Sequence, residues 1–327
     1  MNALADARRP RVNDARGGHY ESWFLRANDP RGSRAFWIRY TLFIPSDESA
    51  PRLGELWAIY FDGARAHPVS AQQDIPWNEC SVGADLQFGE SVLHSGEAKG
   101  AAQGSRHRLA WDLRWRGGTE PLLLLPAPFY ERGFPKAKAL VSHPLVEFDG
   151  EIIVDGEPIA INGWRGSENH NWGSRHTDSY AWGQVAGFDN DANAFLECAS
   201  ARLKIGPIWS PVMTLAVLRL GDETIAFNSV KRSWRQKAQY APGRWSLVCV
   251  QDGTKLHVTM RADAKDIVAL RYRNPPGGIK TCLNTKIASC EALLERPGAA
   301  PLHLTSAHGA AFEILTDAPP SDGIYGN

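Results

Sequence analysis

Apolar and polar side chains alternate with a period of two residues along almost the whole chain of 327 residues. The segment 36–44 (FWIRYTLFI) is rich in aromatic and β-branched residues and stops at Pro45, as a strand does. Segments 245–250 and 255–260 flank Asp252-Gly253, a pair that favours the type I′ turn of a β-hairpin. Convincing helical stripes are almost absent, so the chain is predicted to be all-β with many short strands.

Two further Asp-Gly pairs, at 149–150 and 155–156, predict turns on either side of a short strand at 152–154. Turn residues at this density are typical of antiparallel sandwiches and barrels.

The spacing of aromatic residues indicates an internal repeat. Trp23 precedes Phe36 by 13 residues (36 − 23 = 13), and Trp182 precedes Phe195 by the same interval (195 − 182 = 13). In both places an Asn- and Asp-containing turn lies between the two aromatic residues. Strands of similar character follow before a glycine in each half. We therefore predict two tandem antiparallel β-barrel domains, at 17–175 and 176–327.

The composition excludes several classes of protein. The chain has 36 basic and 36 acidic residues, so no net charge points to a nucleic-acid partner. Residues 1–16 contain four arginines and no apolar segment follows them, which predicts a disordered basic tail rather than a secretory signal. The five cysteines are scattered and form no CxxC pair, a pattern expected of reduced thiols in a cytoplasmic protein.

The stretch Gly163–His176 (GWRGSENHNWGSRH), followed by Tyr180-Ala181-Trp182-Gly183-Gln184, lies at the predicted junction of the two domains. Ligand sites favour domain interfaces, and the stretch combines glycines with aromatic and titratable side chains. The alternative is a glycine-rich linker between the two domains, whose aromatic residues only pack at the domain interface. As a ligand site, the junction would use the following side chains: Trp23, Trp164, Asn171, Trp172, Tyr180 and Trp182.

These residues carry a resemblance. Together with 149–163 (DGEIIVDGEPIAING) and 306–313 (SAHGAAFE), the stretch resembles the lipocalin-like tandem β-barrel family of AttH-like proteins and carotenoid 1,2-hydratases. That family is distantly similar to fungal Diels–Alderases and tocopherol cyclases. The resemblance implies two lipocalin-like barrels that bind an apolar small molecule, often an isoprenoid or polyketide, without a metal or a nucleotide cofactor.

Hydration or cyclisation of an isolated alkene begins with its protonation, and a carboxylic acid in an apolar environment can donate that proton. The candidates are Glu197 in the strand 194–198 and Glu168 in the junction, with His170 as an acid or base or as a buried structural histidine. If Leu196 and Cys198 face outward, Glu197 faces the barrel lumen. Otherwise it lies on the solvent face of an ordinary strand.

Other polar residues are predicted to be structural. Asp112 alternates with large apolar residues and is expected on an outer face. The spacing of His170, His176 and Asp178 matches no compact zinc motif, so no metal is expected. The run 121–130 (PLLLLPAPFY) is either a buried strand before a proline-rich crossover or a point of peripheral membrane contact.

Two functions remain open from the sequence. The first is an enzyme of the lyase or isomerase class that hydrates or cyclises an apolar alkene by acid catalysis. The second is a lipocalin-like carrier that binds and shields an apolar ligand without turnover. The parity of the strand that carries Glu197 is ambiguous in the sequence, and the environment of that acid separates the two functions.

Overall fold

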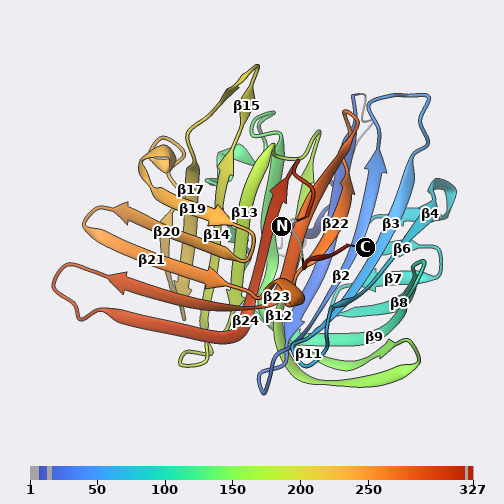
Figure 1. Ribbon diagram of the computed structural model, residues 1–327, viewed down its shortest axis with the longest axis horizontal. Coiled ribbons are helices and arrows are strands. Elements are labelled where there is room, and N and C mark those ends of the chain that lie inside the picture. Colours follow the sequence, from blue (N-terminus) through green and yellow to red (C-terminus); the bar gives the residue numbers. More distant parts are fainter. Residues whose placement is uncertain (1–6, 13–16, 321–322, 327) are drawn as a thin grey trace.

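A computed structural model describes residues 7–12, 17–320 and 323–326. The chain forms two large antiparallel sheets, each curled around its own apolar core, and they lie side by side in Figure 1. This all-β, lipocalin-like architecture confirms the predicted fold class. In the described ranges no helix is long and apolar enough to span a bilayer.

The first sheet has 12 strands in the spatial order β4-β3-β2-β1-β12-β11-β9-β8-β7-β6-β5, with β10 paired to β11. A hydrogen bond from Gln103 N to Gln73 Oε1 (3.0 Å) brings β8 to β4 and helps to close the barrel. In chain order the strands are β1 (His19–Asn28), β2 (Arg34–Ile44), β3 (Leu53–Asp62), β4 (Val69–Pro76), β5 (Cys80–Val82), β6 (Leu86–Phe88), β7 (Ser91–His94), β8 (Glu97–Gln103), β9 (Arg108–Gly117), β10 (Leu122–Leu123), β11 (Ala137–Val154) and β12 (Glu157–Gly173).

The second sheet has 11 strands in the order β18-β17-β14-β13-β24-β23-β21-β20-β19, with β22 paired to β23 and β25. Both sheets thus place a run of successive hairpin strands beside the last long hairpin of the same half. The strands are β13 (Ser179–Ala186), β14 (Ala194–Arg202), β17 (Met213–Leu220), β18 (Glu223–Phe227), β19 (Lys237–Ala241), β20 (Arg244–Gln251), β21 (Thr254–Arg261), β22 (Val268–Arg273), β23 (Ile279–Glu295), β24 (Leu302–Thr316) and β25 (Tyr325–Gly326).

Short elements complete the fold outside the two sheets. A small ribbon, β15 (Lys204–Ile205) with β16 (Ile208–Trp209), stands apart from both sheets. The 3-10 turns are η1 (Trp77–Glu79), η2 (Ala127–Phe129), η3 (Ser233–Arg235) and η4 (Ala264–Asp266).

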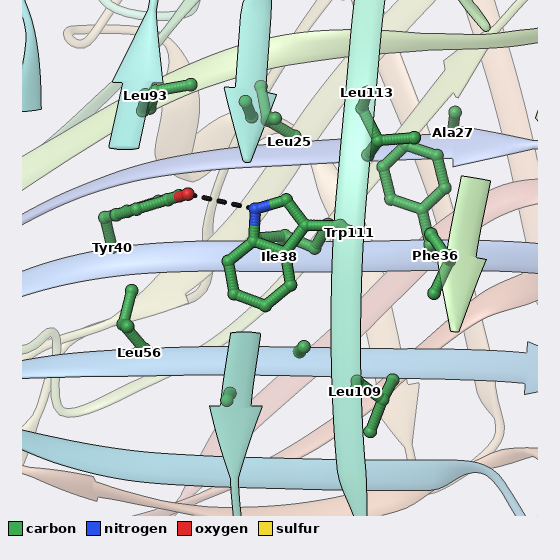
Figure 2. Packing of buried hydrophobic residues seen from close by; sticks show 14 of the residues in the cluster. Leu25, Ala27, Phe36, Ile38, Tyr40, Leu56, Leu93, Leu109, Trp111 and Leu113 are labelled. Carbon is green, nitrogen blue, oxygen red and sulfur yellow. Dashed lines mark hydrogen bonds between the residues drawn. The ribbon is translucent and has the colours of Figure 1, made fainter. Parts of the chain in front are cut away.

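The core of the first barrel is made by alternate residues of its strands, as the period of two predicts. In Figure 2 the indole of Trp111 on β9 points toward Tyr40 on β2, and its Nε1 donates to the Tyr40 hydroxyl (3.0 Å). Leu25, Ile38 and Leu113 pack around this pair. Each of these five side chains is at most 3 % exposed, so the barrel interior is a packed core at this level.

Two of the three predicted Asp-Gly turns are confirmed. Asp252 and Gly253 have φ values of 51° and 81° between β20 and β21, and Asp155-Gly156 makes the same kind of turn between β11 and β12. The turn predicted at Asp149-Gly150 is wrong, because β11 continues through it with an irregularity in its pairing to β12. Gly150 has φ of 130° and its backbone lies close to Asp112 O, so the glycine serves a close approach within the sheet.

The aromatic residues paired in the predicted repeat lie on different faces of their strands in the two halves. Trp23 and Phe36 lie in the core of the first barrel, whereas Trp182 and Phe195 lie on the opposite face of their strands, between the two sheets. A shift of one residue exchanges the faces of a strand, so the predicted alignment of these residues is wrong in the first two strands. Phe24, next to Trp23 in the sequence, lies in the same inter-sheet cluster as Trp182.

Residues 7–12 of the predicted tail are ordered against the first barrel, so the expectation of disorder fails for them. Ala7 is 5 % exposed, and its carbonyl accepts a hydrogen bond of 2.8 Å from His170 Nδ1. The Trp23 indole donates to Arg8 O (3.0 Å). Residues 1–6 and 13–16 of the predicted tail lie outside the described residues.

The apolar run 121–130 begins as the short strand β10 and is partly buried between the sheets. Leu122 and Leu124 belong to an apolar cluster with Phe195 and Val217 of the second sheet. For these two leucines the structure therefore agrees with the first alternative, a buried strand. Peripheral membrane contact elsewhere in the run stays a prediction.

Candidate functional site

A pocket with a cavity volume of about 230 Å³ lies between the two sheets. Phe24 and Trp37 line it from the first sheet, and Trp182 and Glu197 line it from the second. Exposure falls from 56 % at Phe134, which marks the opening, to 1 % at Glu197 in the interior. Most of the lining is apolar, as in sites that bind apolar small molecules.

Glu197 faces this pocket because Leu196 and Cys198, its neighbours on β14, point into the core of the second barrel. The acid therefore occupies neither the barrel lumen nor a solvent face, the two positions considered from the sequence. The Trp182 indole Nε1 donates to Glu197 Oε1 at 3.0 Å. The second oxygen, Oε2, is buried and accepts no hydrogen bond from any described residue.

The Glu197 carboxyl is poised to hold a proton near neutral pH. Burial raises its pKa to about 7, against the lowering effects of the Trp182 hydrogen bond, the neighbouring Gln184 side chain and the Arg26 charge. An acid with this pKa is protonated in a large fraction of molecules at neutral pH and can still release its proton. An acid that lines a mostly apolar pocket and keeps one oxygen unpartnered is a candidate general acid toward a bound ligand.

Aromatic rings form one wall of the pocket beside this acid. The Phe24 ring lies 6.1 Å from the rings of both Trp37 and Trp182, edge-on to the latter. Tyr180 and Asn171 also line the pocket, and Asn171 Oδ1 has no hydrogen-bond partner among the described residues. Glu197, Asn171, Tyr180 and Trp182 are thus the sequence candidates that the structure brings together.

Glu168 and His170 lie elsewhere, on the face of β12 that points into the first barrel. Arg8 from the N-terminal segment pairs with Glu168, and His170 Nε2 is 2.8 Å from Glu21 Oε1. Burial opposes ionisation of Glu21, but hydrogen bonds from His170, His19 and the Arg11 amide outweigh it and lower its pKa to about 2. Both acids of this polar cluster, Glu21 and Glu168, thus have protein partners, and neither lines the inter-sheet pocket.

The remaining tryptophan candidates also belong to the first barrel. Trp23 stacks on His170 at 4.9 Å. Trp172 on the same face lies tilted to His170 at 4.7 Å, under the Arg11 guanidinium. Trp164 is fully buried in the barrel core, stacked on Phe36 at 6.0 Å. None of these three indoles lines the inter-sheet pocket.

The histidine and aspartate residues near the junction have protein partners. His176 Nε2 bonds the Arg273 carbonyl (3.1 Å), and burial together with the Arg39 charge lowers its pKa to about 3. Asp178 pairs with Arg175 and accepts from the Lys204 amide (2.9 Å). In the described part of the chain no cluster of three metal-ligating side chains occurs.

Asp112 is exposed on β9, where its Oδ2 lies 3.1 Å from Lys99 Nζ. The expected outer position is confirmed.

Arg39 is the most unusual pocket residue that the sequence analysis missed. Its side chain is buried beside the pocket, with the guanidinium 4.5 Å from the Tyr272 ring centroid and 5.9 Å from that of Trp37. It donates to Ser22 Oγ (2.7 Å), whereas its Nε has no partner, and no carboxylate of a described residue lies within 4.0 Å of it. Cation–π contacts contribute about 0.5–2 kcal/mol, whereas burying an ion costs several kcal/mol.

A buried polar network on the inter-sheet face of β1 and β13 was also missed. Arg26 Nε donates to Gln184 Oε1 (2.8 Å), and Ser167 Oγ donates to the same oxygen (2.6 Å). Lys286 Nζ donates to Glu313 Oε1 (2.7 Å) behind the rings of Trp37 and Trp182. The sequence did contain one signal for this network: a charged residue within a strand that is otherwise apolar on both faces, such as Arg26 or Arg39.

Fold and site together define a tandem lipocalin-like β-barrel protein with an acid-bearing apolar pocket between its sheets. Solved structures with the same fold include an AttH-like protein of Nitrosomonas europaea, at 14 % identity and a TM-score of 0.55 over 93 % of this chain and 94 % of that one. Kievitone hydratase of Nectria haematococca aligns at 10 % identity and 0.54 over 97 % and 93 %. The structure of CghA with Sch210972 aligns at 11 % and 0.52 over 92 % and 88 %.

These likenesses confirm the predicted relationship at the level of the fold. By sequence, the chain is 24 % identical over 274 residues to an uncharacterized protein of Mycobacterium tuberculosis, which covers 83 % of this chain and 80 % of that protein. No protein-family model matches the chain.

Proposed function

We propose that the protein binds an apolar, unsaturated small molecule between its two sheets and that Glu197 protonates it, leading to hydration or cyclisation. The observation that carries the proposal is the Glu197 carboxyl, which lines a mostly apolar pocket, is 1 % exposed, has a pKa of about 7 and keeps its buried Oε2 unpartnered. Kievitone hydratase and the AttH-like protein share this fold, which supports hydration or cyclisation over unrelated chemistry.

In the proposed reaction, Glu197 Oε2–H transfers its proton to one alkene carbon and the other carbon becomes cationic. Trp37, Trp182 and Phe24 line the same pocket as the acid, and aromatic rings stabilise positive charge through their π-electrons. Water, or a second alkene of the same molecule, then donates an electron pair to the cation. The proton lost in that step returns to the Glu197 carboxylate, so the acid is regenerated.

The test is solvent-deuterium incorporation. Prenylated alcohols and phenols are incubated with the protein in D2O, and the products are analysed by mass spectrometry for a new carbon–deuterium bond. We expect incorporation with the wild-type protein and a loss of about 10²–10⁴-fold in Glu197→Gln, with ligand binding retained. The matched control Glu168→Gln removes an equally buried acid outside the pocket, and we expect it to retain activity when it folds.

Binding without any deuterium incorporation would contradict the enzyme and support the carrier function instead. Equal incorporation by wild type and Glu197→Gln would show that another group donates the proton.

A further inference from the structure

Buried charges of both signs surround the pocket: three cations and the acids Glu55, Glu197 and Glu313. Arg26, Arg39 and Lys286 are each at most 4 % exposed. Of these three cations, only Lys286 has a carboxylate partner, Glu313, within ion-pairing distance among the described residues. Glu197 adds a full negative charge only above its pKa of about 7.

The charges of Glu55 and Glu313 favour the ionised form of Arg39 and help to raise its pKa against burial, but each of these acids binds another cation directly. Glu55 Oε1 accepts from Arg273 Nη1 (2.5 Å), and Glu313 accepts from Lys286 Nζ (2.7 Å) and Asn284 Nδ2 (2.9 Å). Arg39 itself keeps one hydrogen bond, to Ser22, and two aromatic neighbours. Arg39 lines a mostly apolar pocket, and its buried Nε has no partner among the described residues, so the guanidinium retains donor capacity for a ligand.

We propose that the ligand of this pocket carries an anionic oxygen head group, a carboxylate or an enolate, that binds Arg39. This inference rests on the proposed function and names the substrate class of the same pocket. A planar guanidinium binds such oxygens through two parallel hydrogen bonds. Trp37 contacts Arg39, and Phe24 links Trp37 to Trp182, the donor to Glu197.

A ligand bound in this way lies along the aromatic wall, with its head at Arg39 and its unsaturated tail at Glu197. The head group also balances the charge of Arg39, which would otherwise oppose a cation forming at the tail. Arg39 is then a positioning residue, because it holds the ligand and does not act on the reacting carbons.

The test compares three probes that share one isoprenoid tail: farnesoic acid, methyl farnesoate and farnesol. Affinities are measured by titration calorimetry near neutral pH at fixed ionic strength. We expect the wild-type protein to bind the carboxylate at least about tenfold more tightly than either neutral probe, a difference of about 1.4 kcal/mol. Arg39→Met removes that preference and keeps the farnesol affinity, and Arg39→Lys keeps part of it.

Lys138→Met is the matched control. Lys138 also lines the pocket, but its Nζ bonds the Pro135 carbonyl (2.9 Å). We expect this variant to keep the tenfold preference, and its loss there with retention in Arg39→Met would overturn the assignment to Arg39. Equal binding of all three probes by the wild type overturns the head-group inference without any variant.

The two proposals fail in different ways. A carboxylate preference that survives in Glu197→Gln, with no turnover in the wild type, removes the proposed catalysis and leaves the Arg39 inference standing. If none of the three probes binds, both proposals are overturned.

Discussion

Glu168 and Glu197 are both 1 % exposed, yet their surroundings differ completely. Glu168 lies in the first barrel and pairs with Arg8. Glu197 lies between the sheets with one indole donor and one oxygen without a partner. Burial raises the pKa of both carboxyls, but at Glu168 the Arg8 charge and hydrogen bond oppose the rise. The comparison teaches that burial alone does not make an acid available; the lack of a partner does.

The two environments follow from strand parity and from the N-terminal segment. Glu168 shares a face of β12 with His170, and both point into the first barrel, where residues 7–12 supply their partners. Glu197 points away from its own barrel core and toward the neighbouring sheet. No segment of the described chain supplies it with a cation within 4.0 Å.

Removing the partner of Glu168 is expected to give the largest effect. Arg8→Met leaves a buried carboxyl unpaired and should lower the free energy of unfolding by about 3–5 kcal/mol near neutral pH. Urea denaturation measures this loss, which should shrink at acidic pH as Glu168 becomes protonated in both states. In the double variant with Glu168→Gln, part of the loss should be recovered. Strict additivity of the two changes would contradict the pairing.

Glu197→Gln should change how stability depends on pH. The folded-state pKa of about 7 lies above the unfolded value of 4.5, so ionisation of the unfolded chain destabilises the fold as pH rises between these values. Below 4.5 the group is neutral in both states and contributes nothing. The variant should therefore gain about 3 kcal/mol relative to wild type on going from about pH 4 to about pH 8.

Parallel unfolding curves at the two pH values, with a constant difference between wild type and Glu197→Gln, would mean that Glu197 ionises normally in the folded protein.

Trp182→Phe removes the donor to Glu197 Oε1 and keeps most of the ring. Because that hydrogen bond lowers the pKa of Glu197, its loss should raise this pKa by about one unit, equivalent to about 1.4 kcal/mol. The basic limb of the pH–rate profile should therefore move to higher pH by about one pH unit. Tyr130→Phe, which removes a different buried donor, should leave that limb unchanged.

Trp164→Phe gives the smallest effect on the pocket. The indole lies in the first barrel core, so we expect a loss of about 1–2 kcal/mol in stability from the smaller ring and no change in the affinity for farnesol. A large loss of affinity for farnesol would show that Trp164 belongs to the ligand site, as the sequence of the junction predicted.

The sequence predicted the all-β fold because alternation and turn chemistry are local properties. The hairpin at Asp252-Gly253 is an example, since two adjacent residues determine it. The faces of the strands were harder to predict. Strands buried on both faces, such as β2, carry apolar residues on both faces, so the alternation does not show which face points into the barrel.

The site was predicted in part for the same reason. The sequence predicted four residues that do line the pocket: Trp182, Tyr180, Asn171 and Glu197. It also predicted Trp164, Glu168 and His170 from the same junction motif, but these side chains point into the first barrel. Arg39 was missed because an arginine in an apolar strand has no local signal of its partners. Whether such a residue is paired depends on strands far apart in the chain.

An infrared titration of the Glu197 carboxyl tests the central claim most directly. The difference spectrum between wild type and Glu197→Gln isolates the absorption of this one group. We predict a protonated carboxylic acid band in the folded protein at about pH 6 that disappears with a midpoint near the pKa of about 7. A carboxylate band already complete at about pH 5 would contradict the account, because an acid ionised there has no proton to donate at neutral pH.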